Sequence, residues 1–196
     1  MKKRNKYTNL ANGMAFLALN NGSPAFTLLS TYGLMMIRDF TIKQNDRNMK
    51  IKTEAFIALN ILRGALSLIM TYREIFELSI VLVFLNLVIF VMTLIVFKEA
   101  LVYLSKRLEE FDLSNLVVKV RESYYTVIVV ESLLIGISLV VLFTVFFPLQ
   151  FLLNFTSLFL NPGFNVIISL GLTLIKYIAS RSFSRAAVML HNAAQI

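Results

Sequence analysis

The chain of 196 residues has no cysteine and only one histidine. The lack of cysteine excludes disulfide bonds, thiolate metal sites and a cysteine nucleophile. The one histidine, His191, lies close to the end of the sequence, where a lone histidine is more often a surface residue than a ligand. The motifs of zinc proteases, serine hydrolases and P-loop proteins are also missing. We therefore expect a protein that is not an enzyme and that binds no metal and no cofactor.

Charged residues are also scarce. They make up 15% of the chain, and hydrophobic residues make up 58%, whereas soluble domains typically have about 25% charged and roughly 45–50% apolar residues. The apolar residues are concentrated in blocks of about 20 residues, the length that a helix needs to cross the hydrocarbon core of a bilayer. The alternating segments of about 10 residues that mark a membrane β-barrel are not seen. The composition therefore predicts an all-α, multi-pass membrane protein.

Four apolar blocks predict four transmembrane helices, which cover about residues 54–72, 76–97, 125–147 and 163–180. Two shorter apolar segments, 24–37 and 149–160, are too short to span a bilayer alone and are typical of interfacial or re-entrant helices. Ser23 and Pro24 indicate where the first of these begins, with serine as the N-cap and proline at the first helical position.

Basic residues are distributed unevenly between the predicted connections. Lysine and arginine cluster at residues 2–6, 38–52, 98–121 and 176–185. In contrast, the connection 148–162 has none, and the turn between the first two spans has only Arg73. The positive-inside rule therefore places both termini and the linker 98–124 in the cytoplasm. The first and third spans then run outward, and the second and fourth run inward.

This topology divides the chain into five segments. A basic cytoplasmic segment with an interfacial or re-entrant helix is followed by a transmembrane hairpin, an amphipathic linker, a second hairpin with an interfacial segment, and a cytoplasmic tail. The predicted boundaries are 1–53, 54–97, 98–124, 125–180 and 181–196. The net charge of +8 largely reflects the positive-inside distribution and suits anionic lipid headgroups on the cytoplasmic face. No aromatic and basic module indicates nucleic-acid binding.

The linker 98–124 has a helical pattern of its own. Leu101, Leu104, Leu108 and Phe111 recur at spacings of three and four with charged residues between them, which predicts an amphipathic helix that continues the second span. The sequence DLSN then interrupts the pattern, and a second helix leads into the third span. The apolar face either packs within the chain, as an antiparallel hairpin, or forms a docking face for another chain.

Polar residues recur within all four predicted spans, and five of them are the predicted members of an intramembrane polar cluster: Asn60, Arg63, Asn86, Glu131 and Lys176. Lipid offers them no hydrogen-bond partner, so they should face each other, a partner subunit or water. Arg63 and Glu131 lie roughly 14 Å and roughly 9 Å from the cytoplasmic ends of their spans, at about 1.5 Å per residue, which makes them the preferred pair. Asn86 lies deeper, and Lys176 is close enough to the cytoplasmic end of its span to snorkel.

Two interpretations of this polar cluster are open. In the structural one, the ion pair and its hydrogen bonds fix the register of a closed bundle. In the functional one, the charges line a path for an ion or solute, because ionisable residues inside membranes are usually functional. A single ion pair without further carboxylates would make a sparse pathway.

The pattern as a whole favours a membrane subunit of a channel, transporter or translocation complex. Four helices rarely enclose a wide pore, so a conducting path would form between subunits of a homo-oligomer or with other membrane subunits. The alternative is a structural or accessory subunit of a larger membrane assembly that conducts nothing itself. The lipid bilayer and its anionic headgroups are the other partners that we expect.

Overall fold

The computed structural model describes residues 6–20, 24–72, 76–147, 157 and 162–193. In these residues the fold is all-helical, with six helices and no strand. The helices are α1 (Lys6–Ala18), α2 (Pro24–Gln44), α3 (Arg47–Tyr72), α4 (Phe76–Glu110), α5 (Ser114–Phe146) and α7 (Pro162–Ala193).

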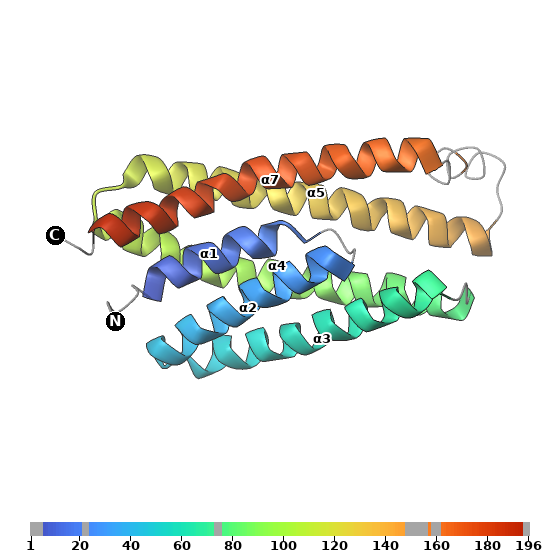
Figure 1. The fold of residues 1–196 in the computed structure, drawn as a ribbon, viewed down its shortest axis with the longest axis horizontal. Coiled ribbons are helices and arrows are strands. Elements are labelled where there is room, and N and C mark those ends of the chain that lie inside the picture. Colours follow the sequence, from blue (N-terminus) through green and yellow to red (C-terminus); the bar gives the residue numbers. More distant parts are fainter. Residues whose placement is uncertain (1–5, 21–23, 73–75, 148–156, 158–161, 194–196) are drawn as a thin grey trace.

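The helices form one elongated bundle with a helix at its centre. Each helix packs on the next along the chain, α7 packs back on α1, and α1 also contacts α4. Figure 1 shows α1 between the α5–α7 pair and the α2, α3 and α4 helices. The start of α1, the end of α7 and the turns at 45–46 and 111–113 lie at one end of the bundle, which we call the basic end (Figure 1). The opposite end is the far end.

Short turns at the basic end are built from residues suited to them. Asn45 and Asp112 have positive φ angles of 58° and 54°, a conformation that asparagine and aspartate tolerate better than most residues. Asp46 caps α3, because its Oδ1 accepts a 2.9 Å hydrogen bond from the backbone N–H of Met49. The break that the sequence DLSN predicts is present, since α4 ends at Glu110 and α5 begins at Ser114.

Within the described part of the chain, three helices are long and apolar enough to cross a membrane: Arg47–Met70, Ile80–Glu110 and Ser114–Thr144. They contain most of the first three predicted spans, so the chain is compatible with a membrane location. The fourth predicted span, 163–180, lies within α7 but is not among these three, so it stays a prediction. The segment 149–160 lies outside the described residues, apart from residue 157.

The N-terminal segment differs from the expectation of one interfacial helix. It contains two helices, and α2 begins at Pro24 as predicted but continues to Gln44. α1 is mostly buried among the other helices. The two helices cross at Gly13 and Gly33, where a Cβ atom on Gly13 would lie 2.7 Å from the carbonyl oxygen of Gly33. Glycine at both positions is what allows the two backbones to approach so closely.

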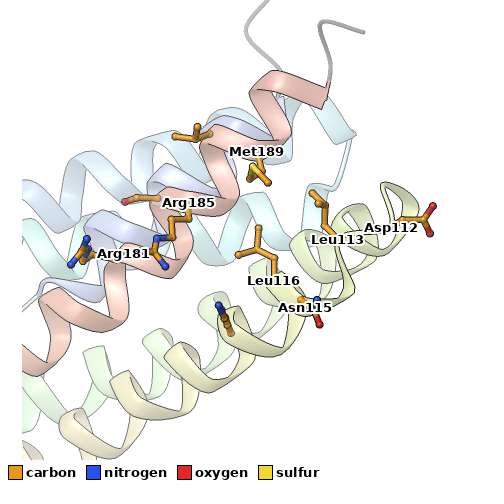
Figure 2. Close-up of a pocket in the computed structure, with 10 residues that line it drawn as sticks. Asp112, Leu113, Asn115, Leu116, Arg181, Arg185 and Met189 are labelled. Carbon is orange, nitrogen blue, oxygen red and sulfur yellow. The ribbon is translucent and has the colours of Figure 1, made fainter.

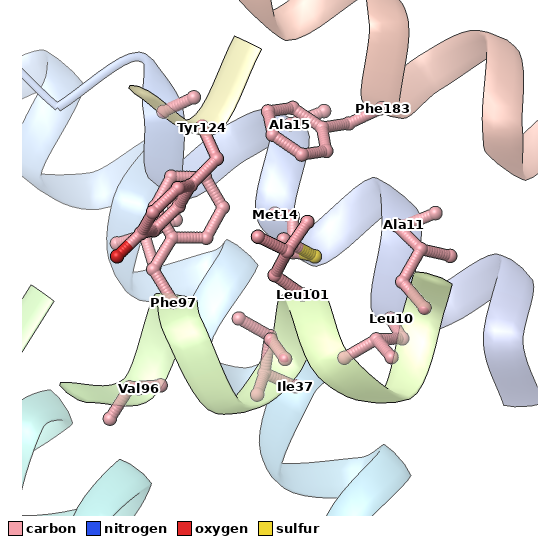
Figure 3. Packing of buried hydrophobic residues seen from close by; sticks show 14 of the residues in the cluster. Leu10, Ala11, Met14, Ala15, Ile37, Val96, Phe97, Leu101, Tyr124 and Phe183 are labelled. Atoms are coloured by element: carbon pink, nitrogen blue, oxygen red, sulfur yellow. The ribbon is translucent and has the colours of Figure 1, made fainter. Parts of the chain in front are cut away.

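The apolar core surrounds α1. Figure 3 shows Met14 and neighbouring α1 side chains packed against residues of α2, α4, α5 and α7, including Phe97 and Phe183. Leu101, Leu104 and Leu108 belong to the same core, and Phe111 packs against it. The face that could have docked another chain is therefore covered by this chain's own helices, as the antiparallel-hairpin alternative requires.

Burial is confined to one half of the bundle. Between the basic end and the level of Arg63, Leu85, Glu131 and Lys176, many side chains are fully buried. Beyond that level, Thr144 is the only buried side chain among the described residues. We call these two regions the basic half and the far half. α1 has 13 residues and is therefore only about 20 Å long, so it fills the centre of the basic half alone.

Candidate functional site: a buried polar cluster

Arg63 lies on α3 at the boundary between the two halves and is 4% exposed. Its Nη2 donates to three oxygens: Asn20 Oδ1 at 2.6 Å, Asn60 Oδ1 at 2.7 Å and Thr27 Oγ1 at 3.2 Å. Because Nη2 carries only two hydrogens, the three acceptors share them. The buried cation is thus held by neutral amide and hydroxyl groups of α2, of α3 and of Asn20, which follows α1.

Lys176 lies on α7 and is 1% exposed. Its ammonium group donates to Glu131 Oε1 on α5 at 2.5 Å and to the backbone carbonyl of Asn20. The prediction that Lys176 snorkels to the cytoplasmic surface is therefore wrong. Because α7 packs on α1, the lysine finds the carboxylate of Glu131 and the backbone carbonyl of Asn20 inside the bundle and does not extend to water.

Asn20 joins the two cations. Its side-chain oxygen accepts from Arg63, and its backbone oxygen accepts from Lys176. It stands two residues beyond the end of α1, where the last carbonyls of a helix lack partners and the helix dipole is negative. The C-terminal end of α1 therefore attracts both cations, and the two cations satisfy groups that would otherwise be costly to bury.

The hydroxyl groups of α2 complete the network. The amide nitrogen of Asn60 donates to Ser30 Oγ at 2.8 Å, to Thr31 Oγ1 at 2.9 Å and to the carbonyl of Thr27 at 3.2 Å. We call the complete set the Arg63–Lys176 cluster; its members are Asn20, Thr27, Ser30, Thr31, Asn60, Arg63, Glu131 and Lys176.

The structure places four of the five predicted residues in this cluster. Asn60 contacts Arg63 and Glu131 contacts Lys176, whereas Asn86, which is half-buried on α4, stands apart from the network. Arg63 and Glu131, the preferred pair, do not form an ion pair. The carboxylate of Glu131 binds Lys176 instead, and the guanidinium of Arg63 donates its hydrogen bonds to Asn20, Thr27 and Asn60.

Sequence reasoning missed the contribution of the N-terminal hairpin. Thr27, Ser30 and Thr31 recur at helical spacing within an apolar segment, and this is the signal that could have identified them. Asn20 had no comparable signal. Its role depends on α1 ending beside α3 and α7, and on the contact between α7 and α1, helices that lie far apart in the sequence.

The cluster carries a formal charge of +1, from two cations and one carboxylate. The Nε–H of Arg63 is buried and has no hydrogen-bond partner among the residues that the structure describes, so within these residues the guanidinium retains an unused donor. A cavity of about 20 Å³ lies beside Lys176 and is lined also by Leu134, Ser169 and Thr173. That is about the space that one water molecule needs. The excess positive charge and the unused donor suit an anion or a polar solute.

Two further findings concern metal binding and similarity to known proteins. Among the described residues, no group of three histidine, cysteine, aspartate or glutamate side chains could hold a metal ion. No family model, curated protein or solved structure matches the chain. The function is therefore inferred from the residues of the chain itself.

Proposed function

We propose that the protein is a non-enzymatic integral membrane subunit of a channel, transporter or translocation complex, and that the Arg63–Lys176 cluster is the part that meets the solute. The observation that carries the proposal is a pair of buried cations at the end of a helix that stops inside the bundle. Helices that end within the membrane region are tolerated where they are covered by protein or line a cavity, and transporters use such ends to bind ions.

The charge of the cluster indicates the class of solute. Two cations against one carboxylate leave an uncompensated positive charge, which is costly in a region of low dielectric. An anion would lower that cost and could accept the unused N–H of Arg63. The proposal therefore favours an anionic solute over a cationic one.

The packing of the two halves indicates the route. α1 fills the centre of the basic half with buried side chains such as Leu10, Met14 and Leu17, so a path through that half would have to run between subunits. Among the residues that the structure describes, no helix fills the centre of the far half, which borders directly on the cluster. A solute would therefore reach the cluster from the far end.

A structural or accessory role is the second candidate, and one observation favours it. The hydrogen bonds of the cluster connect α1 with α3 and α7, α2 with α3, and α5 with α7. A network of this kind would hold the N-terminal hairpin in place even in a protein that conducts nothing.

Flux measurements separate these candidates. Purified protein in liposomes, loaded in turn with chloride, phosphate and a carboxylate, should release at least one anion faster than protein-free liposomes. Arg63→Gln and Lys176→Gln should each reduce that flux at least tenfold, while the matched variant Lys43→Gln, at an exposed position of α2, leaves it unchanged. A folded protein that releases none of these anions, and that copurifies with other membrane proteins, would instead be an accessory subunit.

A further inference from the structure

A groove of about 560 Å³ lies at the basic end, between α7 and the start of α5. Figure 2 shows Arg181 and Arg185 on successive turns of α7, facing Leu113, Asn115 and Leu116 at the start of α5. Lys119 lines the groove as well. Three basic side chains from two helices thus converge on one concave surface.

These three cations have no acidic partner. Lys119, Arg181 and Arg185 are exposed and form no ion pair with any described residue. Asp112, at the rim, is the only carboxylate among the lining residues, so the groove has a formal charge of +2.

A second groove, of about 770 Å³ between α4 and α5, provides a contrast. It is lined by Lys98, Lys106 and Arg121, but it also contains Glu109, which accepts a 3.4 Å hydrogen bond from Arg121. Only the first groove therefore presents a set of basic side chains that are all free of internal ion pairs.

The depth of the first groove suits a lipid headgroup. Arg181 follows directly on the predicted span 163–180, and Lys119 precedes the predicted span 125–147 by about 9 Å at 1.5 Å per residue. On the same face of α7 as Arg181, at helical spacing, Leu170, Leu174 and Ile178 are 65%, 59% and 59% exposed. An apolar strip therefore leads along α7 from the far half directly to the basic groove.

We propose that this groove binds the phosphate of an anionic phospholipid, whose acyl chains lie along the strip formed by Leu170, Leu174 and Ile178. Lys119, Arg181 and Arg185 neutralise the phosphate, and the hydroxyl of Ser184 provides a neutral donor from the lining. Leu116 and Met189 add apolar surface to the lining of the groove, which lowers the local dielectric and strengthens the attraction.

This site differs from a general attraction of the basic face for anionic membranes, because it requires three particular side chains and an adjacent apolar strip. It shares no residue with the Arg63–Lys176 cluster and does not rest on the proposed transport. A protein that conducts nothing could still bind lipid here.

The test compares two triple variants that remove the same charge. The first is Lys119→Gln, Arg181→Gln and Arg185→Gln; the second is Lys43→Gln, Lys98→Gln and Lys106→Gln, at exposed positions outside the groove. Binding of dioctanoyl phosphatidylglycerol, dioctanoyl phosphatidylcholine and inorganic phosphate is measured for each protein in detergent, by thermal shift and by native mass spectrometry. Circular dichroism checks that both triple variants retain their helices.

Phosphatidylglycerol should bind the unmodified protein at least tenfold more tightly than phosphatidylcholine. Because each basic contact near a membrane surface is worth about fivefold in affinity, the groove variant should lose about 100-fold. The control variant should lose less than threefold. Equal losses in the two variants would show diffuse charge attraction and overturn the proposal. Binding of inorganic phosphate as tight as that of phosphatidylglycerol would overturn the assignment to a lipid.

Discussion

The basic half and the far half of the bundle are built from the same long helices but are stabilised differently. In the basic half, the five other described helices surround α1, and residues such as Leu104 and Phe183 are completely buried. In the far half, large apolar side chains such as Phe84 and Leu170 are 57% and 65% exposed. The first half resembles the interior of a soluble protein, whereas the second requires an apolar solvent or an apolar partner.

One short helix accounts for much of this difference. α1 supplies the central layer of the basic half and ends at Ala18, and the described residues of the far half form no corresponding core. In a membrane, apolar side chains gain little by packing against one another, because the lipid tails around them are equally apolar. Helix association there depends on close packing and polar contacts instead. The Arg63–Lys176 cluster lies at the boundary between the basic half, which has a buried apolar core, and the far half, which does not show one in its described residues.

Glycine substitutions should show the contrast most strongly. Gly13→Ala places a Cβ atom 2.7 Å from the carbonyl oxygen of Gly33, and it should destabilise the protein by about 2–3 kcal/mol or prevent folding, because two backbones must separate. Gly171→Ala, on α7 in the far half, meets nothing within 4 Å and should be neutral or stabilise by up to about 1 kcal/mol. Chemical denaturation in detergent measures both. Equal effects would mean that α1 and α2 are not packed as described.

Breaking the ion pair at the boundary should have an effect of similar size. Glu131→Gln leaves Lys176 buried without its carboxylate and should cost about 3 kcal/mol. The double variant with Lys176→Gln should be more stable than the two single variants predict, by about 1–3 kcal/mol. The same cycle with Arg63→Gln in place of Lys176→Gln should show weaker coupling. Strict additivity between Glu131 and Lys176 would contradict their pairing.

Truncation of a leucine tests the two halves directly. Leu104→Ala removes a fully buried side chain of the basic half and should cost about 2–4 kcal/mol. Leu170→Ala removes an exposed side chain of the far half and should cost less than about 0.5 kcal/mol in detergent. A large cost at Leu170 would reveal that the far half is packed against another chain.

The smallest effect concerns the turn at the basic end. The Met49 N–H and the Tyr103 hydroxyl donate to the carboxylate of Asp46 and hold its pKa below the ordinary value. A lowered pKa in the folded state means that this stabilisation is present above about pH 4, the ordinary value for aspartate, and is lost as the pH falls through the folded pKa. Asp46→Ala should therefore cost about 1 kcal/mol at pH 7. The difference from the unmodified protein should shrink as the pH falls below the ordinary aspartate value of about 4; a constant difference would argue against the charged cap.

Much of the fold follows from local sequence patterns. Long apolar blocks predict α3, α4 and α5, and the spacing of Leu101, Leu104 and Leu108 predicts the helix that extends beyond the second span. The length of an apolar block and the spacing of its apolar residues are local properties of the sequence. They therefore predict a helix regardless of how the helices pack together. The same reasoning failed for α1, because its short apolar run among small and polar residues resembles neither a span nor an amphipathic surface helix.

The sequence by itself determined that the helices are long and apolar, and that Arg63, Glu131 and Lys176 need polar partners. Only the tertiary structure decided which partners they have. Depth alone placed Arg63 opposite Glu131, but α7 packs on α1 and brings Lys176 to the carboxylate, while the end of α1 brings Asn20 to the arginine. Burial makes a polar partner obligatory, and the choice among partners is made by which helices become neighbours.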